Sequence, residues 1–129
     1  KLYSLTFYKF LRTVTDANSI IVVQSTSPLV ARKSFWCVTN TLRAAGFHTA
    51  AYHAFVPSFG EWGFTIAVNK PYVRPTAYPV GLRYMDVETA NEMFHFAPDM
   101  AWVDTKIQRL DDQVLIRYFD EEWSKYLIY

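Results

Sequence analysis

The sequence feature that most restricts the fold is a short run of β-branched residues, Ile20-Ile21-Val22-Val23, followed at once by the polar Gln24. A continuous apolar run of this length is typical of a strand buried on both faces, as in a parallel sheet. Before it, apolar residues recur at helical spacing and predict a helix over about residues 3–15. The residues expected on the inner face of that helix are Phe7, Phe10, Leu11 and Val14.

A second helix is predicted directly after this strand. Ser27 and Pro28 suit a helix N-cap and the first helical position, and Gly46 suits the residue that ends the helix. The inner face is then expected to carry Phe35, Val38, Leu42 and Ala45. This helix is the most sharply defined element of the sequence.

Two more strands follow, Phe47–Val56 and Trp62–Val68, separated by the turn signal Pro57-Ser58-Phe59-Gly60. So short a connection requires the two strands to pair antiparallel. The order of elements indicates an α/β fold, the closing half of a doubly wound sheet with an antiparallel last hairpin. The first two strands should run parallel to each other, and the last strand opposite to both.

The character of the sequence changes after residue 70. Prolines and a glycine over residues 71–81 indicate an extended crossing segment without regular structure, and helices are expected over about 86–96 and 113–126. The acidic run Asp120-Glu121-Glu122 in the last helix is expected to face solvent. We therefore expect two parts: a half-domain over residues 1–70, and an extended and helical C-terminal extension over 71–129.

Composition excludes several classes of function. Lys and Arg total 13 against 12 for Asp and Glu, so no long-range field would attract nucleic acid or anionic lipid. The single Cys37 excludes an internal disulfide framework and is compatible with a reducing cytoplasm. No apolar run reaches the roughly 18 residues that span a bilayer, so the chain is expected to be soluble. It begins at Lys1 without a methionine or leader, as an excised fragment would.

Three segments resemble the spermidine synthases, which are polyamine aminopropyltransferases: Leu2–Tyr8, Val22–Pro28 and Tyr52–Phe64. They occur in the order and spacing of that family over about residues 2–69. Gln113–Tyr118 is similar to the tail of the longer bacterial members, in which a membrane-spanning region precedes the synthase domain.

The resemblance implies a Rossmann-like domain of the class I methyltransferase type, in which the last strand inserts between the other two. It also implies that the intact enzyme moves an aminopropyl group from decarboxylated S-adenosylmethionine to a diamine such as putrescine. In this family the glycine-rich nucleoside loop, the ribose-binding acid and the catalytic aspartates precede the segment matched by Leu2-Tyr3-Ser4.

These positions lead to expectations for the chain by itself. We expect that it contributes the amine-facing wall, contains no catalytic residue and binds no cofactor. We also expect that it is inactive alone and forms homo-oligomers. The intact enzyme is expected in the cytoplasm, with an inner-membrane anchor of the parent left open and no membrane contact by this segment.

The resemblance assigns three candidate residues on the amine side. Gln24 matches the family glutamine at the end of the central strand, where its amide can hydrogen-bond the polyamine; the alternative is a bond to nearby backbone. Trp62 matches an aromatic residue that lines the amine pocket and attracts an ammonium group; the alternative is a core tryptophan. Phe59 lies where many relatives carry a tyrosine, in a shorter loop. A hydroxyl contact would then be lost, which leaves the identity of the amine open.

Two further residues are weaker candidates for substrate binding. Glu61 could pair with a substrate ammonium or could be an exposed turn residue. His53 could form a pocket wall or exchange a proton, although a histidine in an aromatic strand is more often structural. His48 and His95 lack paired ligand spacing, so no metal site is expected.

Two alternative functions stay open at this point. One is an S-adenosylmethionine-dependent, methyltransferase-like enzyme with the same fold and another acceptor. The other is a noncatalytic homologue that acts as an assembly or regulatory module. A phosphate loop, a nucleophile elbow and a CxxC pair are all absent from the sequence, and Cys37 would need an activating partner to act as a nucleophile.

Overall fold

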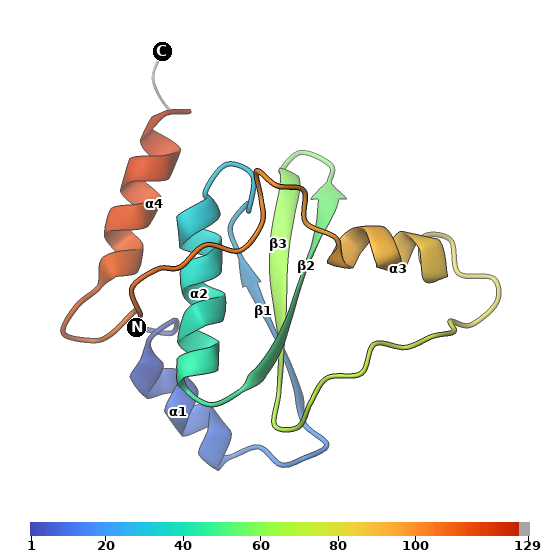
Figure 1. The fold of residues 1–129 in the computed structure, drawn as a ribbon, viewed down its shortest axis with the longest axis horizontal. Helices are drawn as coiled ribbons and strands as arrows, with labels where there is room; N and C mark the ends of the chain where they lie inside the picture. The colour runs from blue at the N-terminus through green and yellow to red at the C-terminus, as the bar shows by residue number, and fades with distance from the viewer. Residues whose placement is uncertain (127–129) are drawn as a thin grey trace.

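The computed structural model describes residues 1–126, and Figure 1 shows a small sheet with helices at its sides. Its elements, in chain order, are α1 (Leu5–Thr13), β1 (Ile20–Ser25), α2 (Arg32–Ala44), β2 (His48–Val56), β3 (Gly60–Val68), α3 (Val87–Phe94) and α4 (Val114–Ser124). The helices and strands expected from the sequence are therefore present, with shifted ends. The described part of the chain is an α/β structure, as predicted.

The sheet has three strands in the order β1-β3-β2. β3 pairs antiparallel with both neighbours, so β1 and β2 run in the same direction on either side of it. This confirms the predicted directions and the insertion of the last strand between the other two. The β2–β3 connection is a tight turn in which Ser58 and Gly60 both have positive φ angles, 75° and 84°. Gly60 adopts such an angle without steric cost.

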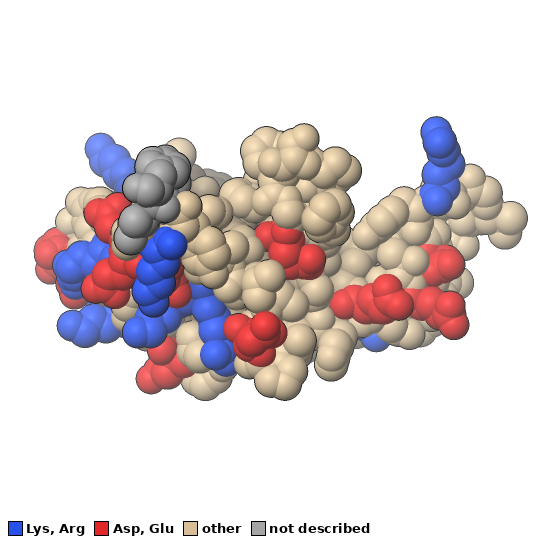
Figure 2. Space-filling view, turned by 90° about the horizontal axis from the view of Figure 1, so that it is seen from above, with Lys and Arg blue, Asp and Glu red and all other residues tan. Residues whose placement is uncertain are grey.

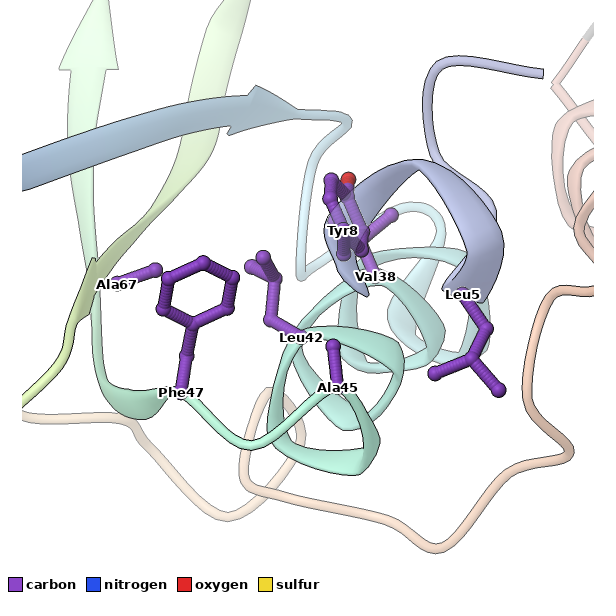
Figure 3. Packing of buried hydrophobic residues seen from close by; sticks show 7 residues of the cluster. All are labelled: Leu5, Tyr8, Val38, Leu42, Ala45, Phe47 and Ala67. Carbon is purple, nitrogen blue, oxygen red and sulfur yellow. The ribbon is translucent and has the colours of Figure 1, made fainter. Parts of the chain in front are cut away.

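Helix α2 covers one face of the sheet, and its predicted inner face is buried, as are all its residues from Ser34 to Leu42. Phe35, Val38, Leu42 and Ala45 are all buried. Figure 3 shows the core in which α1, α2 and the sheet meet, made of Leu5, Tyr8, Val38, Leu42, Ala45, Phe47 and Ala67. Gly46, with a φ angle of 103°, follows the helix directly, as its sequence position indicated.

The first strand departs from the prediction that both of its faces are buried. Ile20 is 69% exposed and Val22 is 52% exposed, whereas Ile21 and Val23 pack against the core. The reason is that β1 lies at an edge of the sheet, and on this strand the described helices cover only the face that Ile21 and Val23 share. An unbroken apolar run indicates that both faces of a strand suit burial, but it does not show whether another element packs on each face.

The predicted inner face of the first helix is also partly wrong. Phe10 and Val14 are exposed, while Leu5 and Tyr8 are the buried residues of α1. The helix docks against α2 through the stripe that contains Leu5 and Tyr8, with Phe7 and Leu11 partly buried at its margin. The apolar spacing therefore identified a helix but selected a stripe rotated from the buried one.

The second helix begins later than Ser27-Pro28 predicts. The Ser27 hydroxyl accepts hydrogen bonds from the backbone N–H groups of Leu29 and Val30, at 3.3 and 3.2 Å. It therefore caps a separate turn over residues 28–31, and α2 starts only at Arg32. Ser27 therefore acts as a cap, as predicted, but the turn that it caps precedes the helix.

The second half of the described chain lies around this unit rather than within the sheet. Residues 71–86 contain no helix or strand, as the prolines predicted, and α3 then packs against β2 at the edge of the sheet (Figure 1). α4 packs against α2. The backbone carbonyl of Met100 accepts a hydrogen bond of 2.8 Å from the Trp36 indole, so the linking segment is also attached to α2.

A buried pair of hydroxyl groups joins α2 to the sheet and gives a test of this packing. Thr39 and Thr65 are fully buried, and their Oγ1 atoms are 2.6 Å apart. Thr65→Val removes one partner, so we expect unfolding to become easier by about 1–3 kcal/mol. The double variant T39V/T65V should cost less than the sum of the single variants, because it leaves no unpaired hydroxyl.

Urea unfolding measures both effects. The exposed Thr76→Val is the matched control and should change stability by less than about 0.5 kcal/mol. Fully additive costs in the double variant would contradict the buried pairing.

Candidate functional site

The candidate residues gather at one end of the sheet. β1 and β2 both finish there, next to the β2–β3 turn at the top of Figure 1. The backbone N–H of Gly63 donates to the Thr26 carbonyl at 3.2 Å, which joins the end of β1 to the start of β3. In open α/β sheets, ligands bind beyond the carboxyl ends of the strands. This end is therefore the candidate site.

The strand register distributes the candidate residues between the two faces of the sheet. Gln24 and Tyr52 both lie opposite Phe64, and Ala54 lies opposite Trp62. Residues directly opposite each other share a face, and successive residues alternate between faces. Gln24 and Trp62 therefore share the face away from α2, together with two aromatic residues that the sequence analysis did not single out, Tyr52 and Phe64. The alternation of side chains along the strands predicts that Tyr52 and Phe64 lie on this face once the register is known.

Aromatic rings form most of the wall beside Gln24. Tyr52 and Phe64 stack with ring centroids 5.1 Å apart, and Phe94 of α3 lies 5.5 Å from Tyr52. Burial is the main cause of the raised pKa of Tyr52, with Tyr72 adding to it. The phenol of Tyr52 thus stays neutral at physiological pH and offers a ring face and a hydroxyl.

At the turn, Phe59 and Trp62 form a second aromatic pair, with centroids 5.8 Å apart. Phe59 is 69% exposed, while the Trp62 indole N–H is buried and lacks a hydrogen-bond partner among the described residues. Aromatic faces of this kind pack on methylene groups and attract ammonium groups. The turn therefore offers an apolar, cation-attracting rim to the Gln24 face.

Gln24 itself has an exposed side chain at the end of β1. Its backbone carbonyl accepts a hydrogen bond of 3.3 Å from the Tyr3 hydroxyl. The side-chain amide projects from the face that carries Trp62, and it offers both a donor and an acceptor there.

His53 and Glu61 lie on the opposite face, the one that α2 covers. The His53 Nδ1 contacts the Glu61 carboxylate, and its Nε2 lies 2.6 Å from the backbone carbonyl of His95. Each nitrogen of the ring therefore has a polar neighbour, one on β3 and one just after α3. The Phe96 ring packs edge-on against it at 4.8 Å. This geometry favours a structural role for His53, in which it links the β2–β3 hairpin to the residues after α3, over contact with a substrate.

In residues 1–126, no three His, Cys, Asp or Glu side chains come close enough together to hold a metal ion. Over the same range, no helix has the length and apolar character needed to cross a membrane.

Charged side chains are distributed unevenly over the surface. In Figure 2, Lys and Arg are mixed with Asp and Glu at the left, on the side of α4, whereas the charged groups in the middle and most of those at the right are acidic. A large basic patch, as expected of a nucleic-acid surface, is not visible on this side of the molecule.

Cys37 lies on α2, and its side chain is buried beneath the segment that contains Lys106. It is fully buried, and its thiol donates a long hydrogen bond of 3.3 Å to the Lys106 carbonyl. Burial is the main cause that raises the pKa of this thiol to about 11. A neutral, enclosed thiol is a poor nucleophile, which agrees with the missing activating partner.

Comparisons with known proteins point to one family. Residues 1–78 match the family described as the spermine/spermidine synthase domain. Polyamine aminopropyltransferase 2 of Ralstonia nicotianae is 46% identical over 125 residues, covering 95% of this chain and 24% of that protein. The polyamine aminopropyltransferase of Leptospira interrogans is 40% identical over 127 residues, covering 98% of this chain and 26% of that protein. The chain thus spans about a quarter of the length of these relatives.

The state of Cys37 gives a direct test. At pH 8 a thiol with a pKa of about 11 is ionised in roughly one molecule in a thousand, so we expect disulfide reagents to modify the native chain very slowly. Raising the pH towards 11 should accelerate the reaction, and unfolding in urea should bring its rate to that of a free thiol. Rapid modification of the native chain at pH 8 would contradict the buried placement.

Proposed function

This chain belongs to the spermine/spermidine synthase family, and from that premise we propose that it forms the amine-facing wall of a longer polyamine aminopropyltransferase. The observation that carries the proposal is that Gln24 and Trp62 share one face of the sheet, at the carboxyl end of β1. Names of relatives such as the polyamine aminopropyltransferases of Ralstonia and Leptospira support the same reaction class.

In the proposed reaction, an amine attacks the aminopropyl carbon bonded to the sulfonium of decarboxylated S-adenosylmethionine. A C–N bond forms while the C–S bond breaks, and the sulfur leaves as a neutral thioether. The new ammonium then loses a proton to a base. Since the sulfonium is already a good leaving group, the enzyme's task is to position the amine and keep its attacking nitrogen neutral.

Each residue of the wall has a chemical part in this proposal. The Gln24 amide hydrogen-bonds the amine, and Trp62 packs on the methylene chain and attracts the distal ammonium. Phe59 adds an aromatic surface without a hydroxyl, so it contributes no hydrogen bond. Tyr52 and Phe64 extend the same wall towards α3. The acceptor is a diamine such as putrescine.

His53 and Glu61 have a different place in the proposal. Their side chains contact each other on the face that α2 covers, which favours attachment of the hairpin over contact with the amine. A direct role of Glu61 in binding a substrate ammonium stays a prediction of the sequence.

The remaining parts of the proposal concern the organisation of the protein. Residues 1–70 are the half-domain that completes the sheet, and 71–129 are the extension, of which the described residues 71–126 pack around the half-domain. The family match over residues 1–78 supports the first boundary. The reaction is placed in the cytoplasm, with any membrane anchor outside residues 1–129.

Kinetics of the full-length enzyme that contains this chain test the wall. Gln24→Ala or Trp62→Ala should lower kcat/KM for the diamine by an amount equivalent to about 1–3 kcal/mol, because each removes a contact to the amine. Binding of the nucleoside should change little. The exposed Gln113, whose side chain does not cap α4, provides the matched control Gln113→Ala. Unchanged diamine kinetics in both variants would remove these residues from the site.

A second test uses residues 1–129 alone. We expect no measurable binding of decarboxylated S-adenosylmethionine by calorimetry and no turnover with putrescine, since one wall cannot orient two reactants. We also expect self-association in light scattering, because β1 pairs only with β3 in the described chain and its other edge presents unpaired backbone groups.

Val22→Lys places a charge on the exposed face of this edge strand and should weaken the association. Submillimolar nucleoside binding would contradict the first half of this expectation, and a monomer at all concentrations would contradict the second.

A further inference from the structure

The N-terminus of α2 lacks a cap from its own sequence neighbourhood. The N-cap residue is Ala31, which offers no side-chain hydrogen bond, and the first turn contains no acidic residue. The first N–H groups of a helix have no partner within the helix, and they carry the positive end of its dipole. Another part of the chain has to satisfy them.

Glu122 of α4 supplies the missing cap. Its carboxylate oxygens accept hydrogen bonds from the backbone N–H groups of Lys33 and Ser34, both at 2.8 Å. The Ser34 hydroxyl donates a third bond to the same carboxylate, also at 2.8 Å. Bonds to a charged acceptor at a helix N-terminus are among the stronger ones in proteins. The sequence predicted that Glu122 faces solvent with Asp120 and Glu121, and for Glu122 this is wrong. Its side chain is partly buried because its carboxylate lies against the first N–H groups of α2.

The next residue of α4 reaches the end of β1. The Trp123 indole N–H donates to the Thr26 hydroxyl at 3.0 Å. The Thr26 backbone carbonyl in turn accepts the bond from Gly63, and Tyr3 bonds the Gln24 carbonyl. The strand end that carries Gln24 is thus held by Tyr3, which precedes α1, by β3 and by α4.

α4 also closes the space behind this strand end. A pocket of about 110 Å³ there is lined by Ser25 and Thr26 on one side and by Leu115 and Phe119 of α4 on another. Ser25, next to Gln24, is buried there, and its hydroxyl has no hydrogen-bond partner among the described residues. Without α4, this side of β1 would open to solvent.

We propose that Glu122 and Trp123 are positioning residues that fix the Gln24 end of β1 for the amine. The inference rests on the proposed function, since it assigns the two residues to the same wall. Both lie beyond residues 1–78, which match the synthase-domain family, but within the 98% of the chain over which the Leptospira interrogans relative is similar. The C-terminal extension accordingly contributes to the acceptor site indirectly, by holding residues 24–26 in place.

Glu122→Gln and Trp123→Phe in the full-length enzyme test the proposal. The first keeps the shape of the side chain and removes its charge, while the second keeps a ring and removes the donor. Each should raise the KM for putrescine about three- to tenfold, with kcat and nucleoside affinity within about twofold of the parent. The neighbouring Glu121 is exposed, so Glu121→Gln is the matched control and should change none of these values.

A double variant tests whether the effect passes through Gln24. If α4 acts by positioning that residue, Gln24→Ala combined with Glu122→Gln should have the same KM as Gln24→Ala alone. Independent, multiplying effects would overturn the positioning role. Amide hydrogen exchange in the full-length enzyme should also show that the N–H groups of Lys33 and Ser34 lose about tenfold or more of their protection in Glu122→Gln. Unchanged protection would overturn the capping step.

The outcomes separate the two proposals. If Gln24→Ala raises the KM for putrescine while the Glu122 and Trp123 variants behave like Glu121→Gln, the positioning proposal alone fails. If Gln24→Ala leaves the KM unchanged, Gln24 is not part of the amine wall and the positioning proposal fails; the wall as a whole fails if Trp62→Ala also leaves the diamine kinetics unchanged. Equal losses of amine and nucleoside binding in the α4 variants would indicate general destabilisation and would also overturn positioning.

Discussion

From Gly63 to Val68, every residue of β3 has a partner on β1 and another on β2. The other features of the sheet depend on this double pairing. It sets β1 and β2 in the same direction, brings the strand ends and the turn to one end, and fixes which side chains share a face. A shift of β3 by one residue would move Trp62 to the α2 face and separate it from Gln24, because side chains alternate along a strand. The absence of a side chain at Gly63 belongs to the same arrangement, since an added Cβ there would meet the Phe35 ring of α2.

Much of this fold could be predicted from local sequence. Proline and glycine positions, β-branched runs and helical spacing gave each element its type, and the short β2–β3 link required an antiparallel pair. Burial was harder to predict because it depends on what lies across each face. Ile20 and Val22 have the character of core residues and are nevertheless exposed, since cover for that face of β1 is absent from residues 1–126. In α1 the apolar residues extend around more than one stripe, and only docking against α2 selected Leu5 and Tyr8.

The candidate site shows the same division between local and long-range information. The family resemblance supplied Gln24 and Trp62, but their shared face follows only from the register. His53 and Glu61 are close to Trp62 in sequence and lie on the other face, where they contact each other. The contact between Glu122 and the start of α2 could not be predicted from local sequence. Nothing near Glu122 in the sequence indicates that a helix far away lacks a cap, and an acidic run in a terminal helix ordinarily faces solvent.

The distance between α2 and its cap has a consequence for the order in which the protein is made. Glu122 follows Ser34 by 88 residues, so α2, the β2–β3 hairpin and α3 are all synthesised before the carboxylate that caps α2. Until then the first N–H groups of α2 are left to water, and the end of β1 lacks its contact from Trp123. Contacts this distant in sequence form late, after the loop between them has closed. The three strands can therefore pair early, while the end of β1 gains its contact from Trp123 only after α4 has been synthesised.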